Sequence, residues 1–280
     1  MSPAFLAISA VVLVVLVGLV IWALVGGGGG GGGSSSNSAV AKLEAERANL
    51  ATIPAAYFDG TSLGDKNAPL VMEMYEDFQC PFCLRYTVEM EPTLVDEYVK
   101  TGKVRMVFKH FPILGAESVS AGKAGYCAAQ QNKFWPFANR LFTMQAASGQ
   151  LDAEKVNVGR YSDANLRGHA EAAGLDLAQY DACYASPAAA TAVADDNRAA
   201  SRLGLRGTPS FVFNGRPLQG GSPGSLDSWR ALLDEQIAAA LASPSPAASA
   251  SASPAASSTA SPTTTASPAA TPSPSGTAAR

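Results

Sequence analysis

Cys80 and Cys83 are the residues of this sequence best placed to do chemistry, because only two residues separate them. They follow an apolar, strand-like run at 70–75 and precede a segment at 84–100 that has no glycine and carries apolar residues at roughly helical spacing. Pro81 fits the first turn of such a helix, where its missing N–H costs no hydrogen bond. The unpaired N–H groups and the positive dipole end of a helix stabilise a thiolate, and Cys-x-x-Cys thiols placed there have pKa values of roughly 3.5–7.5 instead of ~8.5. The pattern therefore predicts a redox-active dithiol.

A structural zinc site is the alternative use of a Cys-x-x-Cys pair. Such a site needs a second pair of ligands at short spacing. Cys127 and Cys183 stand far apart in the sequence, and the two histidines, His110 and His169, have no partner at metal-ligand spacing. The strand-turn-helix context favours redox use. We expect no metal and no other cofactor, and we expect both histidines to be structural or surface residues.

Composition divides the 280 residues into four parts. Residues 1–25 contain an uncharged apolar run long enough to cross a bilayer, without the basic start and short core of a cleaved signal, so we expect an uncleaved transmembrane anchor; a signal peptide is the alternative. Residues 26–54 are a Gly/Ser-rich linker and a short stalk that could be helical at 39–50. Residues 55–242 can form one domain with a sizeable core. Residues 243–280 are rich in Ser, Pro, Ala and Thr and are expected to be a disordered tail.

The periodicity within 55–242 predicts an α/β fold. We expect strands and helices to alternate around the dithiol, with a kink where Pro92 interrupts the first helix. A long, all-helical block then separates the first two strands from a hairpin whose turn is Asn214–Gly215. The expected elements are a strand at 70–75, a helix at 84–100, a strand at 104–108, helices at about 115–204, a strand at 205–213 and a final helix at 226–242.

Several blocks of this sequence, taken together, resemble the DsbA-like, thioredoxin-fold thiol–disulfide oxidoreductases of bacterial envelopes. The resemblance covers about 55–242 and excludes both ends of the chain. Its most specific feature is the pairing of the Cys-x-x-Cys motif with a Gly-Thr-Pro segment that precedes a strand and an Asn-Gly turn. The blocks that carry it are 63–69, 77–83, 108–112, 131–135, 141–142 and 207–215. The resemblance implies a thioredoxin-like mixed sheet with an inserted all-helical subdomain at about 115–204.

The resemblance also assigns roles to particular residues. Cys80 and Cys83 would be catalytic, and the Thr208–Pro209 peptide bond would be cis and would face them. The substrate groove would be framed by Pro81, Phe82, Thr208 and Pro209. Cysteines similar to Cys127 and Cys183 form a second, structural disulfide in some relatives; two buried free thiols are the alternative here.

Two positions depart from the pattern of this family. Many relatives carry a buried glutamate six residues before the first cysteine, where this chain has Met74. We interpret the neighbours Glu73 and Glu76 as out of register with that position, so that proton handling would pass through water or Glu76. The second departure is Phe82, where the best-known members have histidine. Phenylalanine cannot stabilise a thiolate by charge, which predicts a milder oxidant.

These observations predict an extracytoplasmic protein thiol–disulfide oxidoreductase, in particular an oxidase that introduces disulfides into exported proteins. The expected partners are cysteine-containing exported proteins and a membrane redox partner of the DsbB or vitamin-K-epoxide-reductase-like kind. A single-pass anchor would hold the catalytic domain outside the cytoplasmic membrane. A reductase or isomerase of the same fold, and a non-catalytic binding or chaperone module, are the alternatives. The net charge of −3, without a basic cluster, gives no indication of nucleic-acid binding.

Overall fold

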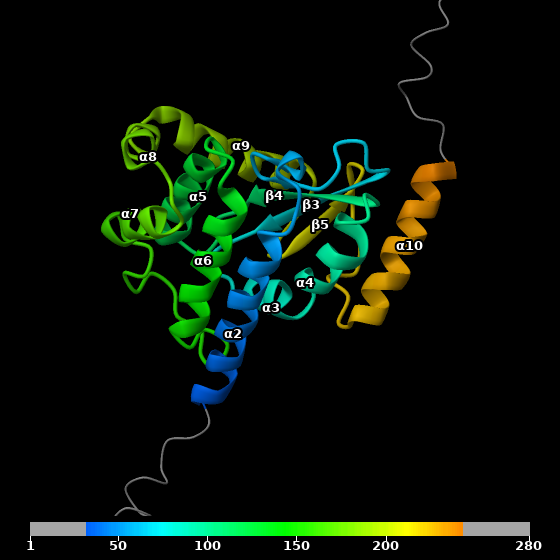
Figure 1. Ribbon diagram of the computed structural model, residues 1–280, viewed down its shortest axis with the longest axis horizontal. Coiled ribbons are helices and arrows are strands. Elements are labelled where there is room, and N and C mark those ends of the chain that lie inside the picture. Colours follow the sequence, from blue (N-terminus) through cyan, green and yellow to red (C-terminus); the bar gives the residue numbers. More distant parts are fainter. Residues whose placement is uncertain (1–31, 243–280) are drawn as a thin grey trace, which may run out of the picture. The chain divides into compact units, whose positions relative to one another are not determined.

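A six-stranded mixed sheet forms the centre of the computed structural model, which describes residues 32–242 (Figure 1). The spatial order is β1-β2-β4-β3-β5-β6, with β3 and β4 parallel and the other neighbours antiparallel. The strands are β1 (Phe58–Asp59), β2 (Ser62–Leu63), β3 (Leu70–Glu76), β4 (Val104–His110), β5 (Ser210–Phe213) and β6 (Arg216–Pro217). This arrangement places β3, which leads into the Cys-x-x-Cys pair, in the interior of the sheet.

The crossover from β3 to β4 contains the dithiol and is helical throughout most of its length. It consists of α3 (Pro81–Glu89), α4 (Glu91–Leu94) and a π-helical turn (Val95–Val99). The expected single helix at 84–100 is therefore divided at Met90, two residues before Pro92. Proline has no N–H to donate and its ring crowds the preceding turn, which accounts for the break.

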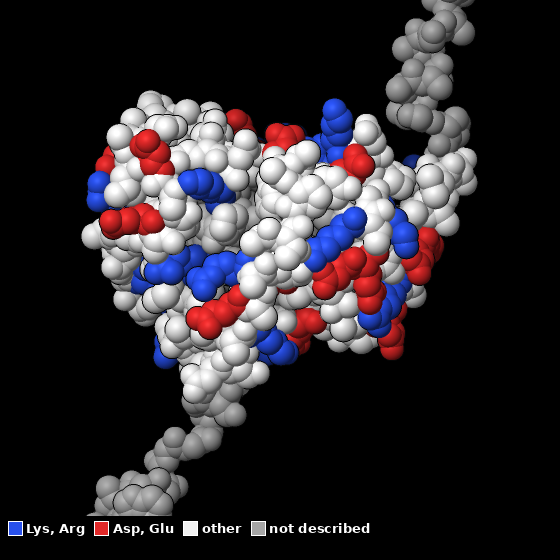
Figure 2. All heavy atoms as spheres, in the orientation of Figure 1, with Lys and Arg blue, Asp and Glu red and all other residues white. Residues whose placement is uncertain are grey.

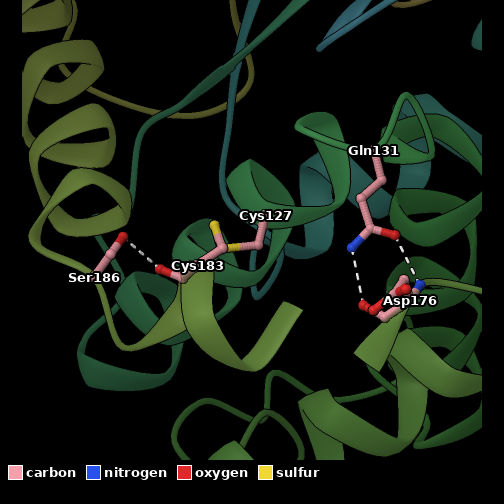
Figure 3. The surroundings of a disulfide bond; sticks show 5 residues. All are labelled: Cys127, Gln131, Asp176, Cys183 and Ser186. Atoms are coloured by element: carbon pink, nitrogen blue, oxygen red, sulfur yellow. Dashed lines mark hydrogen bonds between the residues drawn. A yellow bond between two sulfur atoms is a disulfide. The ribbon is translucent and has the colours of Figure 1, made fainter. Parts of the chain in front are cut away.

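The helical insertion predicted at about 115–204 contains five helices, and Figure 1 shows them gathered on one side of the sheet. Its only disulfide among the described residues joins Cys127 to Cys183, with a Cα–Cα distance of 5.7 Å (Figure 3). Beside it, Gln131 and Asp176 exchange two hydrogen bonds, so the end of one helix is tied to the start of another. The helices are α5 (Ala116–Ala129), α6 (Phe134–Ala147), α7 (Asp163–Ala172), α8 (Leu177–Tyr184) and α9 (Pro187–Arg202).

The last helix, α10 (Leu226–Ala242), covers another part of the sheet. Its buried residues are Trp229 and Leu233. The Trp229 ring contacts the rings of Tyr86 on α3 and Phe211 on β5, with centroid distances of 5.5 Å and 4.7 Å. This aromatic cluster joins the helix that follows the dithiol to the strand that follows the Gly-Thr-Pro segment.

The helix considered at 39–50 is present and longer, as α2 (Gly32–Leu50), and it belongs to the domain core. Ala39, Leu43 and Leu50 are buried in the main hydrophobic cluster, and the Leu43 carbonyl accepts a hydrogen bond of 2.9 Å from Asn139 on α6. We expected a linker and stalk at 26–54, so the domain boundary at residue 55 leaves out part of the core. Figure 2 shows acidic and basic side chains interspersed on the face that carries α2.

The two ends of the chain lie outside the described residues. The transmembrane anchor predicted at 1–25 and the disordered tail predicted at 243–280 therefore stay predictions. Between residues 32 and 242, no helix combines the length and apolar character that crossing a bilayer requires.

Candidate active site

The Cys-x-x-Cys pair lies at the start of α3, immediately after the carboxyl end of β3. Cys80 is the N-cap of the helix, and Pro81 occupies its first turn. The Cys83 side chain is fully buried, whereas the Phe82 side chain between the two cysteines is 62 % exposed. The strand-turn-helix context predicted from the sequence is present, and both thiols are buried, with Cys80 4 % exposed.

Asp77 fixes the turn that carries the cysteines. Its carboxylate accepts hydrogen bonds from the Gln79 N–H at 2.8 Å and the Ser118 hydroxyl at 2.6 Å. It also accepts the N–H groups of Ile113 and Leu114, each at 2.9 Å. The side chain therefore connects the redox turn to the loop after β4 and to α5. Sequence reasoning did not single out Asp77, although an Asx turn two residues before Gln79 is a local signal that could have identified it.

The Gly-Thr-Pro segment lies against Cys80 because β5 pairs with β3. Ser210 stands opposite Tyr75 in the antiparallel ladder. This pairing brings the cis peptide bond between Thr208 and Pro209 to the dithiol, and the Cys80 thiol donates to the Thr208 carbonyl at 3.3 Å. The structure thus places Thr208 and Pro209 next to a cysteine that is more than a hundred residues away in sequence.

The two thiols have opposite pKa shifts. A hydrogen bond from the Cys83 thiol lowers the pKa of Cys80 to about 7, with further help from the side chain of Thr208 and from the backbone N–H groups of Phe82 and Cys83, while burial opposes the shift. Burial raises the pKa of Cys83 well above its usual value, and the nearby charge of Glu76 adds to the effect. One sulfur is therefore available as a thiolate near neutral pH, and the other retains its proton.

Reduced protein should consequently react with iodoacetamide at Cys80 alone. We expect the alkylation rate to rise with pH to a midpoint near 7, because the thiolate is the reacting form and the pKa of Cys80 is about 7. Mass spectrometry of the modified peptide, sampled between pH 5 and pH 9, measures both the site and the midpoint. Faster modification of Cys83, or a midpoint near the ordinary value of ~8.5, would contradict this assignment.

Glu76 is the residue that could take the place of the glutamate that this chain lacks at position 74. Side chains along a strand alternate between faces, so Glu76 shares a face with Met74, whereas Glu73 lies on the other face near Lys109. The interpretation that Glu76 is out of register with position 74 is therefore wrong. Glu76 is 2 % exposed, and burial, followed by the charge of Glu91, raises its pKa well above the usual range.

Neither histidine of the sequence is part of the dithiol site. His110 is buried at the end of β4, and burial lowers its pKa to about 4. Burial also lowers the pKa of His169, on α7. Both are therefore uncharged near neutral pH. Within residues 32–242, no group of three or more His, Cys, Asp or Glu side chains is close enough together to hold a metal ion.

Comparison with known proteins shows which family combines these features. The sequence profile described as thioredoxin matches residues 58–235. The chain belongs to the thioredoxin family. This thioredoxin-family chain is 29 % identical over 186 residues to a probable disulfide bond formation protein D from Bacillus anthracis; the match covers 65 % of the chain and 80 % of that protein.

Solved structures show the same fold. Oxidised BdbD from Bacillus subtilis superposes with a TM-score of 0.55 at 18 % identity, over 64 % of this chain and 93 % of that one. The α-DsbA1 protein from Wolbachia pipientis superposes with a TM-score of 0.54 at 21 % identity. This match covers 69 % of this chain and 97 % of that one. The predicted thioredoxin-like fold with a DsbA-like helical insertion is confirmed. This thioredoxin-family protein is a thiol–disulfide oxidoreductase.

Proposed function

We propose that the protein is an oxidase that introduces disulfides into exported proteins. The observation that carries this direction is the contrast between Cys80, whose pKa is lowered to about 7, and buried Cys83. A low pKa at the exchanging cysteine stabilises the reduced form, and a stabilised reduced form makes the disulfide oxidising. The exposed ring of Phe82 beside this sulfur provides an apolar surface for an unfolded substrate.

The exchange proceeds in two steps. A substrate thiolate attacks the Cys80 sulfur of the Cys80–Cys83 disulfide; a substrate–Cys80 bond forms, and Cys83 leaves with the electron pair and takes up a proton. A second substrate thiolate then attacks the substrate sulfur, and Cys80 leaves as a thiolate. The substrate has lost two electrons and the dithiol has gained them. Pro81, Phe82, Thr208 and Pro209 would frame the groove in which the substrate chain lies.

Continuous oxidation requires an acceptor for these two electrons. We propose a membrane partner of the DsbB or vitamin-K-epoxide-reductase-like kind, reached by a domain that residues 1–25 anchor outside the cytoplasmic membrane. The disulfide between Cys127 and Cys183 supports an extracytoplasmic location, because such bonds persist in oxidising compartments. Exported proteins with cysteine pairs are the proposed substrates.

The reduction potential of the Cys80–Cys83 pair tests the direction. The purified full-length protein is equilibrated with glutathione buffers, and the reduced fraction is read by alkylation and mass spectrometry. A potential well above about −200 mV supports an oxidase, since isomerases lie near −180 mV. A value near about −270 mV, where thioredoxin lies, would instead indicate a reductase. Failure of the pair to form a disulfide would contradict both.

The Phe82→His variant should be a stronger oxidant than the wild type. An imidazolium beside the Cys80 thiolate favours the charged form, and lowering the pKa of Cys80 by about one unit corresponds to about 1.4 kcal/mol, or a rise of about 30 mV in potential. The effect should be larger at pH 6 than at pH 8, because the histidine is charged only at the lower pH. Phe82→Leu is the matched control and should show no such pH dependence. An unchanged potential at pH 6 would show that position 82 does not tune the dithiol by charge.

A further inference from the structure

A small cavity, lined mostly by apolar side chains but also by two glutamates, lies one helical turn beyond the buried cysteine, where α2, α3, α4 and α6 meet. Its volume is about 10 Å³. That is at the lower limit of the volume that can hold one water molecule. Glu46 of α2 and Glu91 of α4 both line it, which is unusual for a cavity inside a hydrophobic cluster. The other lining residues that matter here are Thr87, Trp135 and Asn139.

Three polar atoms that line this cavity have no hydrogen-bond partner among the described residues. They are Glu46 Oε1, Thr87 Oγ1 and Trp135 Nε1. Each belongs to a side chain that is less than 5 % exposed. Buried polar groups are almost always hydrogen-bonded, to protein or to ordered water, and a buried water molecule makes two to four such bonds. The size of the cavity and its unpartnered atoms both fit an ordered water.

The inner end of the cavity is connected to the dithiol through α3. Thr87 follows Cys83 by four residues, and side chains at this spacing lie on the same face of a helix. Glu91 follows Thr87 by the same spacing and is close enough to Glu76 for its charge to raise the Glu76 pKa. Glu76 in turn interacts with the Cys83 thiol. Glu91 and Glu76 therefore both act on the region between the cavity and the resolving sulfur, and neither carboxylate oxygen of Glu76 has a hydrogen-bond partner among the described residues.

The outer end of the cavity is connected to solvent through α2. Glu46 Oε2 accepts a hydrogen bond of 3.2 Å from Asn49, which also donates to Asp96 at 3.0 Å and accepts from Lys100. The Asp96 side chain is 54 % exposed. Glu46 is therefore placed between the cavity and the exposed side chain of Asp96.

The carboxyl groups in this series can exchange protons near neutral pH. Burial, followed by the charge of Glu46, raises the pKa of Glu91 to about 8. Burial is also the largest cause that raises the pKa of Glu46 to about 7, with Asp96 adding to it and Asn49 and Lys100 opposing it. Tyr86 faces both Glu76 and Glu91, and burial raises its pKa well above the usual range, so it stays protonated.

We propose that the cavity binds a water molecule and that Glu91, this water and Glu46 form a proton path between solvent and the Glu76–Cys83 pair. The proposal rests on exchange at Cys80–Cys83 and concerns how that exchange obtains its proton. When the Cys80–Cys83 bond breaks, the electron pair goes to the Cys83 sulfur and a proton passes to it from Glu76. Glu91 then donates to Glu76, and Glu46 and the water return a proton from solvent to Glu91. In the reverse direction each transfer runs backward.

The test measures the step that uses Cys83. Reduced full-length protein is converted to its Cys80–glutathione mixed disulfide by rapid mixing, and the release of glutathione by Cys83 is followed between pH 5 and pH 9. We expect Glu91→Gln and Glu46→Gln to slow this release by at least about tenfold at pH 7, because general acid–base catalysis by a positioned group contributes 10²–10⁴-fold or so. We also expect both variants to lose part of the pH dependence that the wild type shows.

Glu44→Gln is the matched control, since Glu44 lies on the exposed face of the same helix. It should release glutathione at the wild-type rate. Iodoacetamide should modify Cys80 equally fast in all four proteins, because that reaction needs no proton at Cys83. Wild-type release rates and pH profiles in both glutamine variants would overturn the proposal, as would an equal slowing at every pH, which indicates a structural role.

A crystal structure of the wild type provides an independent readout. It should show a water within hydrogen-bond distance of Glu46 Oε1 and Thr87 Oγ1, and a dry cavity would overturn the proposal. Failure of the proposed function has a different signature. A reduction potential near that of thioredoxin would reverse the direction of exchange, but both glutamine variants would still release glutathione more slowly than the wild type. If no Cys80–Cys83 disulfide formed, there would be no exchange to measure.

Discussion

Cys80→Ser is expected to reduce dithiol oxidation to the rate of the uncatalysed reaction. A hydroxyl can neither form a disulfide nor leave as a stabilised thiolate, and Cys83 cannot replace the missing sulfur. Cys83 is fully buried, and burial raises its pKa well above the usual value. The measurement is the regain of activity by a reduced, unfolded ribonuclease incubated with the oxidised protein.

Cys83→Ser is the variant to compare with Cys80→Ser. Cys80 then keeps its nucleophilic sulfur beside Thr208 but loses the thiol that resolves mixed disulfides. We expect this variant to accumulate covalent complexes with substrate proteins, visible as bands that disappear on reduction, whereas Cys80→Ser forms none. Substantial oxidase activity in the Cys80→Ser protein would exclude the exchange mechanism and favour a module that binds unfolded proteins without chemistry.

Removing the Cys127–Cys183 bond should lower the free energy of unfolding by about 4 kcal/mol. The two cysteines are 56 residues apart, and the chain-entropy argument gives this magnitude for a loop of that length. Tyr180 is the only buried residue of the helix that carries Cys183, so the bridge should matter there. The other contacts that hold this helix are the Arg167–Asp181 ion pair, the hydrogen bond from the Tyr184 hydroxyl to Asp163, and the two hydrogen bonds between Gln131 and Asp176 at its start.

The comparison is best made in a Cys80→Ser/Cys83→Ser background, so that the active-site pair contributes nothing. Adding Cys127→Ser and Cys183→Ser together avoids leaving one reactive thiol. Urea unfolding, followed by circular dichroism, gives the midpoint and the m-value of each protein. An equal urea midpoint in the two proteins would contradict the prediction. It would mean that the bridge does not form in solution, or that the unfolded chain is equally restricted without it.

The parts of this fold that the sequence predicts well are those specified by local pattern. β3, the dithiol at the start of α3, and the hairpin turn at Asn214 all follow from apolar runs and turn residues over short stretches. The approach of Thr208 to Cys80 is different, because it depends on the pairing of β5 with β3. Only the resemblance to a known family could anticipate that contact.

Two features escaped prediction for the same physical reason, which is that burial is decided by distant parts of the chain. The Gly- and Ser-rich composition around α2 is typical of a linker, yet packing against α6 buries Leu43. Glu46 and Glu91 have the charges of a solvated helix face, and only the meeting of four helices encloses them. Glu76 was a simpler failure, since counting strand residues by twos places it on the face of Met74.

The packing of α2 on α6 also determines how this protein should be shortened for laboratory work. The family profile begins at residue 58, and a fragment cut there would lack the whole of α2. It would uncover the apolar surface that Leu43 and Leu50 now protect, and it would open the small cavity to bulk water. A fragment made for laboratory work should therefore begin at or before Gly32, so that the whole of α2 is kept.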